Sequence, residues 1–398
     1  MNKNLTVKYC AHQFMYWAAV GGVVSFAATY LLSLGFSAAQ VGGVLFSALL
    51  LSFLMQPVVG AFADRSEKNI LPLMILALSA LCTVCFLAVR FLPLPQWAFE
   101  VIYVIGVMAL DMQVPLMNSL SVYYTRRGYV INYGLGRGVG GFGFAVATLG
   151  YGYLMEYFGE DWMPLAAVMF ILLAAVITLT YPREEEKEAV SEERESSAPC
   201  TIPEFILKYR WYCLSLFGVL FLGAFHVMTE NYLIEIFKRI GGDSSNVGMA
   251  LFVATVTELP GMTLYPIFLK KYGSRKLLMT SGIFFMVKAI LLTLAGSVAA
   301  IYLVQLLQCL TYVLLSMSQL YYAEECTSAA DMIKGQSMIT ASYTLGCAVG
   351  NLLGGVIISS MGVVSMLYAG IGISALAVVV LAFTLPRAAR ERINNTAK

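Results

Sequence analysis

Long apolar runs alternate with short polar segments along the 398-residue chain. About 20 consecutive apolar residues form a helix long enough to cross a bilayer, and irregular backbone exposed to lipid is unfavourable there. The pattern therefore predicts an all-α integral membrane protein with twelve transmembrane helices. We expect them near residues 10–34, 38–63, 70–92, 97–124, 132–158, 162–181, 211–237, 244–269, 276–296, 298–323, 334–361 and 363–385.

The stretch 183–210 interrupts this pattern in the middle of the chain. It holds eight glutamates mixed with Lys, Arg and Ser, a composition that cannot bury a core. We therefore expect three parts: an N-terminal six-helix bundle at 1–182, a solvated cytoplasmic linker at 183–210 and a C-terminal six-helix bundle at 211–398.

Basic residues are distributed unequally between the two sides of the predicted membrane. Of the 25 Lys and Arg, 20 fall in the termini, the linker and alternate loops, while the opposite side has only Arg90, Lys238 and Arg239. Cytoplasmic loops carry the excess of Lys and Arg. The first apolar run is too long for a signal peptide and lacks a cleavage site. The first helix is therefore expected to be retained. From the distribution of basic residues, we expect both termini in the cytoplasm and the protein in the cytoplasmic (inner) membrane.

Composition excludes several functional classes. The chain is 59% hydrophobic and only 12% charged, so a soluble fold is excluded. A net charge of +2, without a basic tract interleaved with aromatics, argues against nucleic-acid binding. The eight scattered cysteines and two histidines indicate neither a disulfide framework nor a metal site, and no hydrolase or metalloenzyme motif is present. We expect no enzymatic activity and no cofactor.

The two halves repeat each other weakly. An offset of 203 aligns Gly143 with Gly346 and Gly152 with Gly355, and an offset of 206 aligns Gly42 with Gly248. Repeats of this kind are typical of transporters built from two related halves.

Two loops and one helix carry a family resemblance. The loop GAFADRSEK (60–68) and its counterpart KKYGSRK (270–276) resemble the signature of the major facilitator superfamily. The predicted fifth helix, YGLGRGVGGFGF (133–144), resembles a pattern of the branch that contains lactose permease, nucleoside/proton symporters and phenylpropionate permeases. The resemblance implies two pseudo-symmetric six-helix bundles that work by alternating access.

The resemblance also implies roles for individual residues. Arg137 matches the arginine that binds sugar hydroxyls in lactose permease, and Phe144 matches the aromatic that stacks on the sugar ring. Asn118 stands where the permease has its acidic sugar ligand. Asp64 and Arg65 match signature residues that the resemblance assigns to conformational gating.

Six ionisable residues fall at membrane depth, where a charge is costly unless it faces water, a partner or substrate. We treat each as a candidate site residue: Asp111, Arg137, His226, Glu230, Glu258 and Lys288.

Three of these candidates leave alternatives open. His226 and Glu230 are four residues apart on one helical face, so they either pass a proton or form a hydrogen-bonded pair that orders the helix. Asp111 either accepts from Arg137 or substrate, or is structural. Lys288 is expected to pair with a carboxylate, with a partner on the eighth or tenth helix.

The tenth helix departs from lactose permease. Gln305, Gln308 and Thr311 occupy the stretch where the permease carries its Lys, His and proton-bearing Glu. Proton coupling must therefore use other carboxylates, and we rank Glu258 first, then Glu230, then Asp111. Gln305 and Gln308 become substrate candidates, and Asn351 either lines the cavity or joins helices.

These features favour a monomeric secondary transporter that couples a proton to the symport of a small polar organic solute, such as an oligosaccharide, nucleoside or aromatic acid. A drug/proton exporter, an uncoupled or sodium-coupled carrier and a non-transporting sensor are the alternatives. Exporters typically carry a G-P-x-x-G-G element in the fifth helix, which is not evident here.

Overall fold

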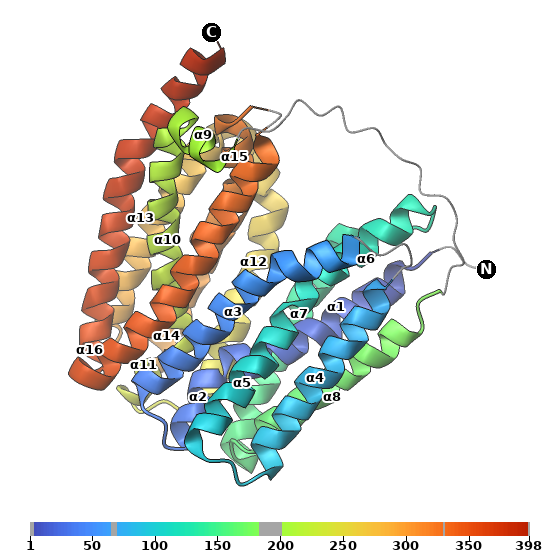
Figure 1. The fold of residues 1–398 in the computed structure, drawn as a ribbon. Helices are drawn as coiled ribbons and strands as arrows, with labels where there is room; N and C mark the ends of the chain where they lie inside the picture. The colour runs from blue at the N-terminus through green and yellow to red at the C-terminus, as the bar shows by residue number, and fades with distance from the viewer. Residues whose placement is uncertain (1–3, 65–69, 183–200, 329–330, 397–398) are drawn as a thin grey trace. The chain divides into compact units, whose positions relative to one another are not determined.

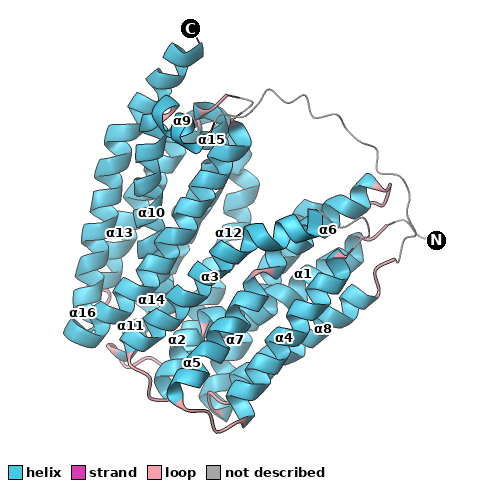
Figure 2. Cartoon of the chain, in the orientation of Figure 1, coloured by secondary structure: helices cyan, strands magenta, loops and turns pink. Residues whose placement is uncertain are grey.

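A computed structural model describes residues 4–64, 70–182, 201–328 and 331–396 (Figure 1). Within these ranges the secondary structure is helical, apart from loops and one isolated bridge between Asn4 and Val130 (Figure 2). The expected all-α architecture is confirmed.

Each of the six spans predicted for the first half is helical. The first is broken, because α1 continues as a π-helical turn, η1, before α2. The helices are α1 (Thr6–Val20), η1 (Gly21–Ser25), α2 (Ala27–Ser33), α3 (Ala38–Asp64), α4 (Leu71–Phe91), α5 (Gln96–Asp111), α6 (Gln113–Arg126), α7 (Tyr133–Phe158) and α8 (Trp162–Leu179).

The six spans predicted for the second half are helical as well. The tenth is interrupted by a 3-10 turn, η2, between α14 and α15. The helices are α9 (Ile202–Lys208), α10 (Arg210–Asn231), α11 (Leu233–Lys238), α12 (Ser244–Tyr272), α13 (Ser274–Leu294), α14 (Val298–Gln305), η2 (Leu306–Cys309), α15 (Tyr312–Cys326) and α16 (Met332–Thr396).

The long α16 contains the last two predicted spans. Gly362 interrupts it with φ +81°, a left-handed conformation that glycine adopts without steric cost. The break falls between the predicted ranges 334–361 and 363–385. In the described part of the chain, nine helices are long and apolar enough to cross a membrane, and a tenth span results if the bent pair Thr6–Ser25 and Ala27–Ser33 counts as one.

The chain forms two compact units. Unit 1 comprises the described residues of Met1–Glu192 with Gly241–Thr255, and unit 2 those of Glu193–Ile240 with Val256–Lys398. In this division the first part of α12 groups with unit 1. The reason is close backbone packing: a Cβ atom added at Gly248 of α12 would lie 2.6 Å from the Thr148 carbonyl oxygen of α7.

The predicted linker does not remain solvated to its end. Residues 183–200 lie outside the described ranges, but α9 begins at a capping box in which the Thr201 backbone N–H donates to Glu204 Oε2 at 2.8 Å. Phe205 of this helix is fully buried. Lys208 Nζ and Tyr209 Oη both donate to Asp331 Oδ2 at 2.9 Å, which anchors α9 to unit 2.

Equivalent glycines join equivalent helices in the two units. A Cβ atom added at Gly143 of α7 would lie 2.7 Å from the Phe14 carbonyl oxygen of α1, and one added at Gly346 of α16 would collide with the Leu220 carbonyl oxygen of α10. Gly143 and Gly346 are 203 positions apart, and Phe14 and Leu220 are 206 apart. The weak sequence repeat therefore corresponds to a repeated helix contact, in which small residues let two backbones approach.

We predict that Gly350→Ala lowers the melting temperature of the purified protein. Its Cβ atom would collide with the Ala224 carbonyl oxygen of α10, and overpacking of this kind costs about 1–3 kcal/mol. Gly372→Ala is the matched control, because a Cβ atom added at Gly372 of the same α16 meets nothing within 4 Å. Equal melting temperatures for the two variants would show that this helix contact is not tight.

Candidate functional site

A buried ammonium group lies at the centre of the polar groups in unit 2. Lys288 of α13 is fully buried, and its Nζ donates to Glu230 Oε1 of α10 at 2.8 Å. A charge in a low-dielectric interior is tolerated when it is paired and hydrogen-bonded. The expectation that Lys288 pairs with a carboxylate is confirmed, but the carboxylate is on the seventh predicted helix rather than the eighth or tenth.

Gln308 connects this ion pair to a second carboxylate. Its Oε1 accepts from Lys288 Nζ at 2.8 Å, while its Nε2 donates to Glu258 Oε1 of α12 at 3.3 Å. Gln308 belongs to the 3-10 turn η2 that interrupts the tenth predicted span. The result is a hydrogen-bonded chain of four groups, Glu230, Lys288, Gln308 and Glu258, which we call the carboxylate–lysine chain.

His226 lies one turn before Glu230 on α10, as its spacing predicted. Its ring stacks on Tyr312, with centroids 4.9 Å apart and planes inclined by 14°, and it meets Phe285 edge-on at 5.9 Å. His226 Nδ1 makes no hydrogen bond with a described residue. Glu230 bonds to Lys288 rather than to His226, so the geometry does not form the pair expected between these two residues.

Two further candidates in unit 2 have different surroundings. Gln305 is fully buried at the end of α14, and its side-chain amide makes no hydrogen bond with a described residue. Asn351 of α16 accepts from Asn231 Nδ2 at 2.7 Å and donates to the Cys347 carbonyl oxygen at 3.2 Å. Asn351 was expected either to line the cavity or to join helices, and these contacts favour the second alternative, because Asn351 links α16 to α10.

Polar and aromatic groups also gather in unit 1. Three residues at a spacing of four lie along α1: Trp17 Nε1 donates to Gln13 Oε1 at 3.0 Å, and Gln13 Nε2 donates to Tyr9 Oη at 2.8 Å. Arg137 of α7 is exposed in this unit, with its guanidinium carbon 4.6 Å from the centre of the Trp17 ring. This distance allows a cation–π interaction.

Asn118 and Phe144 belong to the same region of unit 1. Asn118 Oδ1 of α6 accepts from Tyr133 Oη at 3.3 Å, and the Tyr133 ring lies 6.1 Å from that of Tyr9. Phe144 is half-buried beside Gly21, where α1 becomes π-helical. Tyr9 and Tyr133 were not singled out as candidates in the sequence, although the spacing of Tyr9, Gln13 and Trp17 could have identified the first.

Asp111 and Arg137 do not form an ion pair. Asp111 is the half-buried last residue of α5, at the break before α6, whereas Arg137 packs on Trp17. His12, near the start of α1, is fully buried, and its Nε2 lies 3.3 Å from Thr178 Oγ1 of α8. Within the described ranges, no group of three His, Cys, Asp or Glu could hold a metal ion.

Of the two signature loops, only the second lies wholly within the described residues. Asp64 is the last residue of α3, but its side chain and all of Arg65 lie outside the described residues. In the second copy, Arg275 Nε donates to Glu325 Oε2 of α15 at 3.0 Å. Glu325 Oε1 also accepts from the Ser274 backbone N–H at 3.2 Å, so it caps the start of α13.

Comparison with known proteins identifies the family of this chain. The sequence model of the MFS_1-like family matches residues 6–369. Maltose permease from Geobacillus stearothermophilus is 24% identical over 251 residues, which cover 62% of this chain and 60% of the permease. The match therefore spans less than two thirds of that relative.

Solved structures agree on the fold. The crystal structure of the nucleoside transporter NupG superimposes with a TM-score of 0.79 at 17% identity, covering 97% of this chain and 99% of NupG. A bacterial homologue of the human lysosomal transporter Spinster, in an inward-facing and occupied conformation, gives a TM-score of 0.68 at 15% identity, with 98% of this chain and 97% of that chain covered. At these identities the likeness establishes the architecture alone.

We predict that Glu230 and Lys288 stabilise the fold as a pair. Lys288→Met leaves a buried carboxylate uncompensated and Glu230→Leu leaves a buried ammonium, and removal of one partner of a buried pair costs roughly 3–5 kcal/mol. Each single variant should melt well below the natural protein.

The double variant Lys288→Met with Glu230→Leu is the control, and it should recover most of that loss because neither charge remains. Thermal melting of the purified proteins in detergent measures all three. If the two single losses simply add in the double variant, the two charges do not stabilise each other.

Proposed function

The chain belongs to the MFS_1-like family of the major facilitator superfamily, and on this premise we propose that it is a proton-coupled symporter of a small polar organic solute. Its described helices are long and apolar enough to span a membrane several times, which makes it a multi-pass membrane protein. The single observation that carries the proposal is the carboxylate–lysine chain.

The charges of this chain support proton coupling. Lys288 offsets Glu230, so an ionised Glu258 leaves the group with one negative charge, and a bound proton would bring it to neutrality. A net charge at membrane depth is costly. Proton binding would therefore favour a conformational change that carries these helices through a less hydrated state. We infer that Glu258 takes the proton, with Glu230 as the next candidate and Asp111 of unit 1 the third.

Through Gln308, a bound substrate can change the proton affinity of Glu258. Gln308 links Lys288 to Glu258 through the two ends of one amide, so a solute hydroxyl or amide that replaces it would change the environment of both charges. The effect is reciprocal, because a ligand that alters proton affinity has its own affinity altered by the proton to the same degree. Symport requires this linkage.

Flat aromatic surfaces beside hydrogen-bonding groups support a cyclic polar solute. In unit 2, His226 stacks on Tyr312. His226 lies on α10, which also carries Glu230, and Tyr312 begins α15, the helix after the turn that contains Gln308. In unit 1, Arg137 lies against Trp17. Arg137 belongs to α7, which also carries Phe144. Oligosaccharides, nucleosides and aromatic acids all combine a ring with polar groups. The similar proteins include a maltose permease and a nucleoside transporter.

We infer the orientation from the basic residues. Lys8 and Arg127 of unit 1 and Lys208, Arg275 and Lys276 of unit 2 lie in the loops and helix ends that the positive-inside rule assigns to the cytoplasm. Cytoplasmic termini, a location in the cytoplasmic membrane and action as a monomer complete the proposal, with Asp64 and Arg65 as gating residues.

We predict that Glu258→Gln abolishes accumulation of solute against its gradient while exchange continues. The amide cannot carry the proton but keeps the size of the side chain and an oxygen that accepts from Gln308. Radiolabelled maltose, uridine and 3-phenylpropionate, each tested in proteoliposomes with and without an imposed proton gradient, measure both activities.

Glu235→Gln is the matched control, because Glu235 of α11 pairs with Lys238 at 2.9 Å and belongs to no part of the carboxylate–lysine chain. This variant should accumulate solute normally. Full accumulation by Glu258→Gln would remove Glu258 as the proton carrier, and Glu230→Gln would be examined next.

A further inference from the structure

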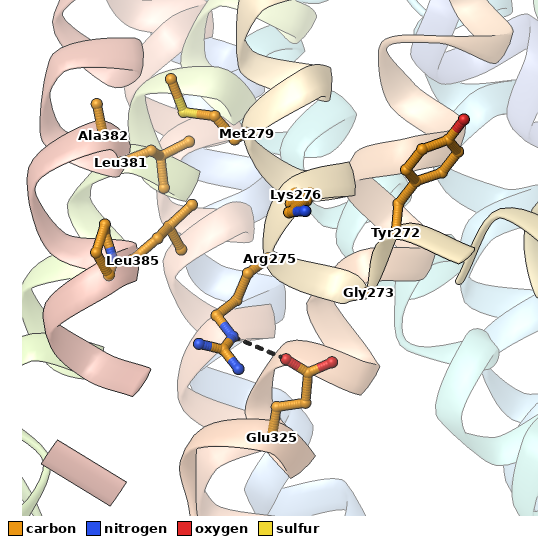
Figure 3. Close-up of a pocket in the computed structure, with 10 residues that line it drawn as sticks. Tyr272, Gly273, Arg275, Lys276, Met279, Glu325, Leu381, Ala382 and Leu385 are labelled. Atoms are coloured by element: carbon orange, nitrogen blue, oxygen red, sulfur yellow. Dashed lines mark hydrogen bonds and ion pairs between the residues drawn. The ribbon is translucent and has the colours of Figure 1, made fainter. Parts of the chain in front are cut away.

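A cavity of about 590 Å³ lies in unit 2, away from the carboxylate–lysine chain. Its lining residues come from four helices: the end of α12, the start of α13, the end of α15 and residues 381–386 of α16 (Figure 3). Gly273, between α12 and α13, also lines it. None of its lining residues takes part in the proposed transport chemistry, so the inference drawn from it does not depend on that function.

One wall of this cavity is apolar. Met279 of α13 gives this wall part of its accessible surface, while Leu381 and Leu385 of α16 are buried behind it. Ala382 of α16 adds an exposed small side chain to the same wall. A methylene chain would gain hydrophobic free energy when it is buried against such a surface.

The other wall carries an excess of positive charge. Arg275 and Lys276 line it together with a single acid, Glu325. Glu325 is already engaged by Arg275 Nε and by the Ser274 backbone N–H. The guanidinium Nη atoms of Arg275 and the ammonium of Lys276 make no hydrogen bond with a described residue. These donors are available to an anion.

The two walls meet at the boundary of the predicted membrane. The apolar sequence of α13 begins at Leu277, directly after Lys276, while the last turn of α12 carries the basic pair Lys270 and Lys271. A ligand for this place needs an anionic group at the water side and an apolar chain on the membrane side. Free phosphate satisfies only the first requirement.

We propose that this cavity binds one anionic phospholipid, with its phosphodiester at Arg275 and Lys276 and the start of an acyl chain against Met279 and Ala382. Guanidinium groups bind phosphate oxygens in a planar, two-pronged arrangement, and lysine adds a point charge. The bound lipid fills the space between the start of α13 and residues 381–386 of α16.

Native mass spectrometry of the purified full chain tests this proposal, with phosphatidylglycerol titrated as the anionic probe and phosphatidylcholine as the zwitterionic one. A basic side chain near an anionic lipid surface contributes about 1 kcal/mol, so Lys276→Gln should weaken binding of the first phosphatidylglycerol roughly fivefold. Lys276 is exposed and its replacement breaks no described ion pair.

Lys270→Gln is the matched control, because it removes the same charge from an exposed residue outside the cavity. Binding should be unchanged. Ala382→Trp is a second variant that fills the apolar wall without altering charge, and it should also weaken lipid binding. Both effects should appear in variants that melt at the temperature of the natural protein.

Four results would overturn the proposal. Equal losses for Lys276→Gln and Lys270→Gln would indicate diffuse surface attraction. Equal binding of phosphatidylcholine would show that anionic charge is not recognised. Displacement of the lipid by inorganic phosphate at equal concentration would indicate a simple anion site. Unchanged binding in both Lys276→Gln and Ala382→Trp would place the lipid elsewhere.

Discussion

The buried ammonium of Lys288 is the constraint on which the rest of unit 2 depends. A fully buried cation requires a carboxylate, and Glu230 supplies it at 2.8 Å. That pair fixes α10 against α13, and the remaining Nζ contact fixes Gln308, which in turn reaches Glu258. Four helical segments are thus held by one chain of charges and amides. The same chain supplies the groups that a proton and a polar solute would use, so stability and the proposed coupling share one set of atoms.

Glycine contacts make these polar arrangements possible. In unit 1, α7 lies close enough to α1 for Arg137 to reach Trp17, and in unit 2, α16 lies close enough to α10 for Asn351 to bond to Asn231. Larger residues at Gly143 or Gly346 would separate these helices. Because the contact is repeated, each unit places its polar side chains on helices whose spacing is fixed by backbone packing. The tight contacts therefore position the candidate site as well as stabilise the fold.

The sequence predicted the spans well, because the cost of exposing polar backbone to lipid makes length and hydropathy sufficient signals. It also anticipated the break near Gly362 and the ionisable residues of the site. It did not predict which charges meet. Lys288 bonds to Gln308 of the tenth predicted helix, where a partner was expected, but its carboxylate partner is Glu230 of the seventh. Arg137 was a candidate partner of Asp111, yet it packs on Trp17. Which side chains meet depends on the rotation of each helix about its axis and on the turn η2. The amino-acid sequence of a single helix determines neither.

The central claim is that solute and proton move together, and proteoliposomes with a trapped pH-sensitive dye test it most directly. A sugar, a nucleoside and an aromatic acid would each be added outside, with no imposed gradient, while internal pH is followed. We predict acidification with one of the three classes and none with Glu258→Gln. Uptake of a radiolabelled solute without any change in internal pH would contradict proton symport.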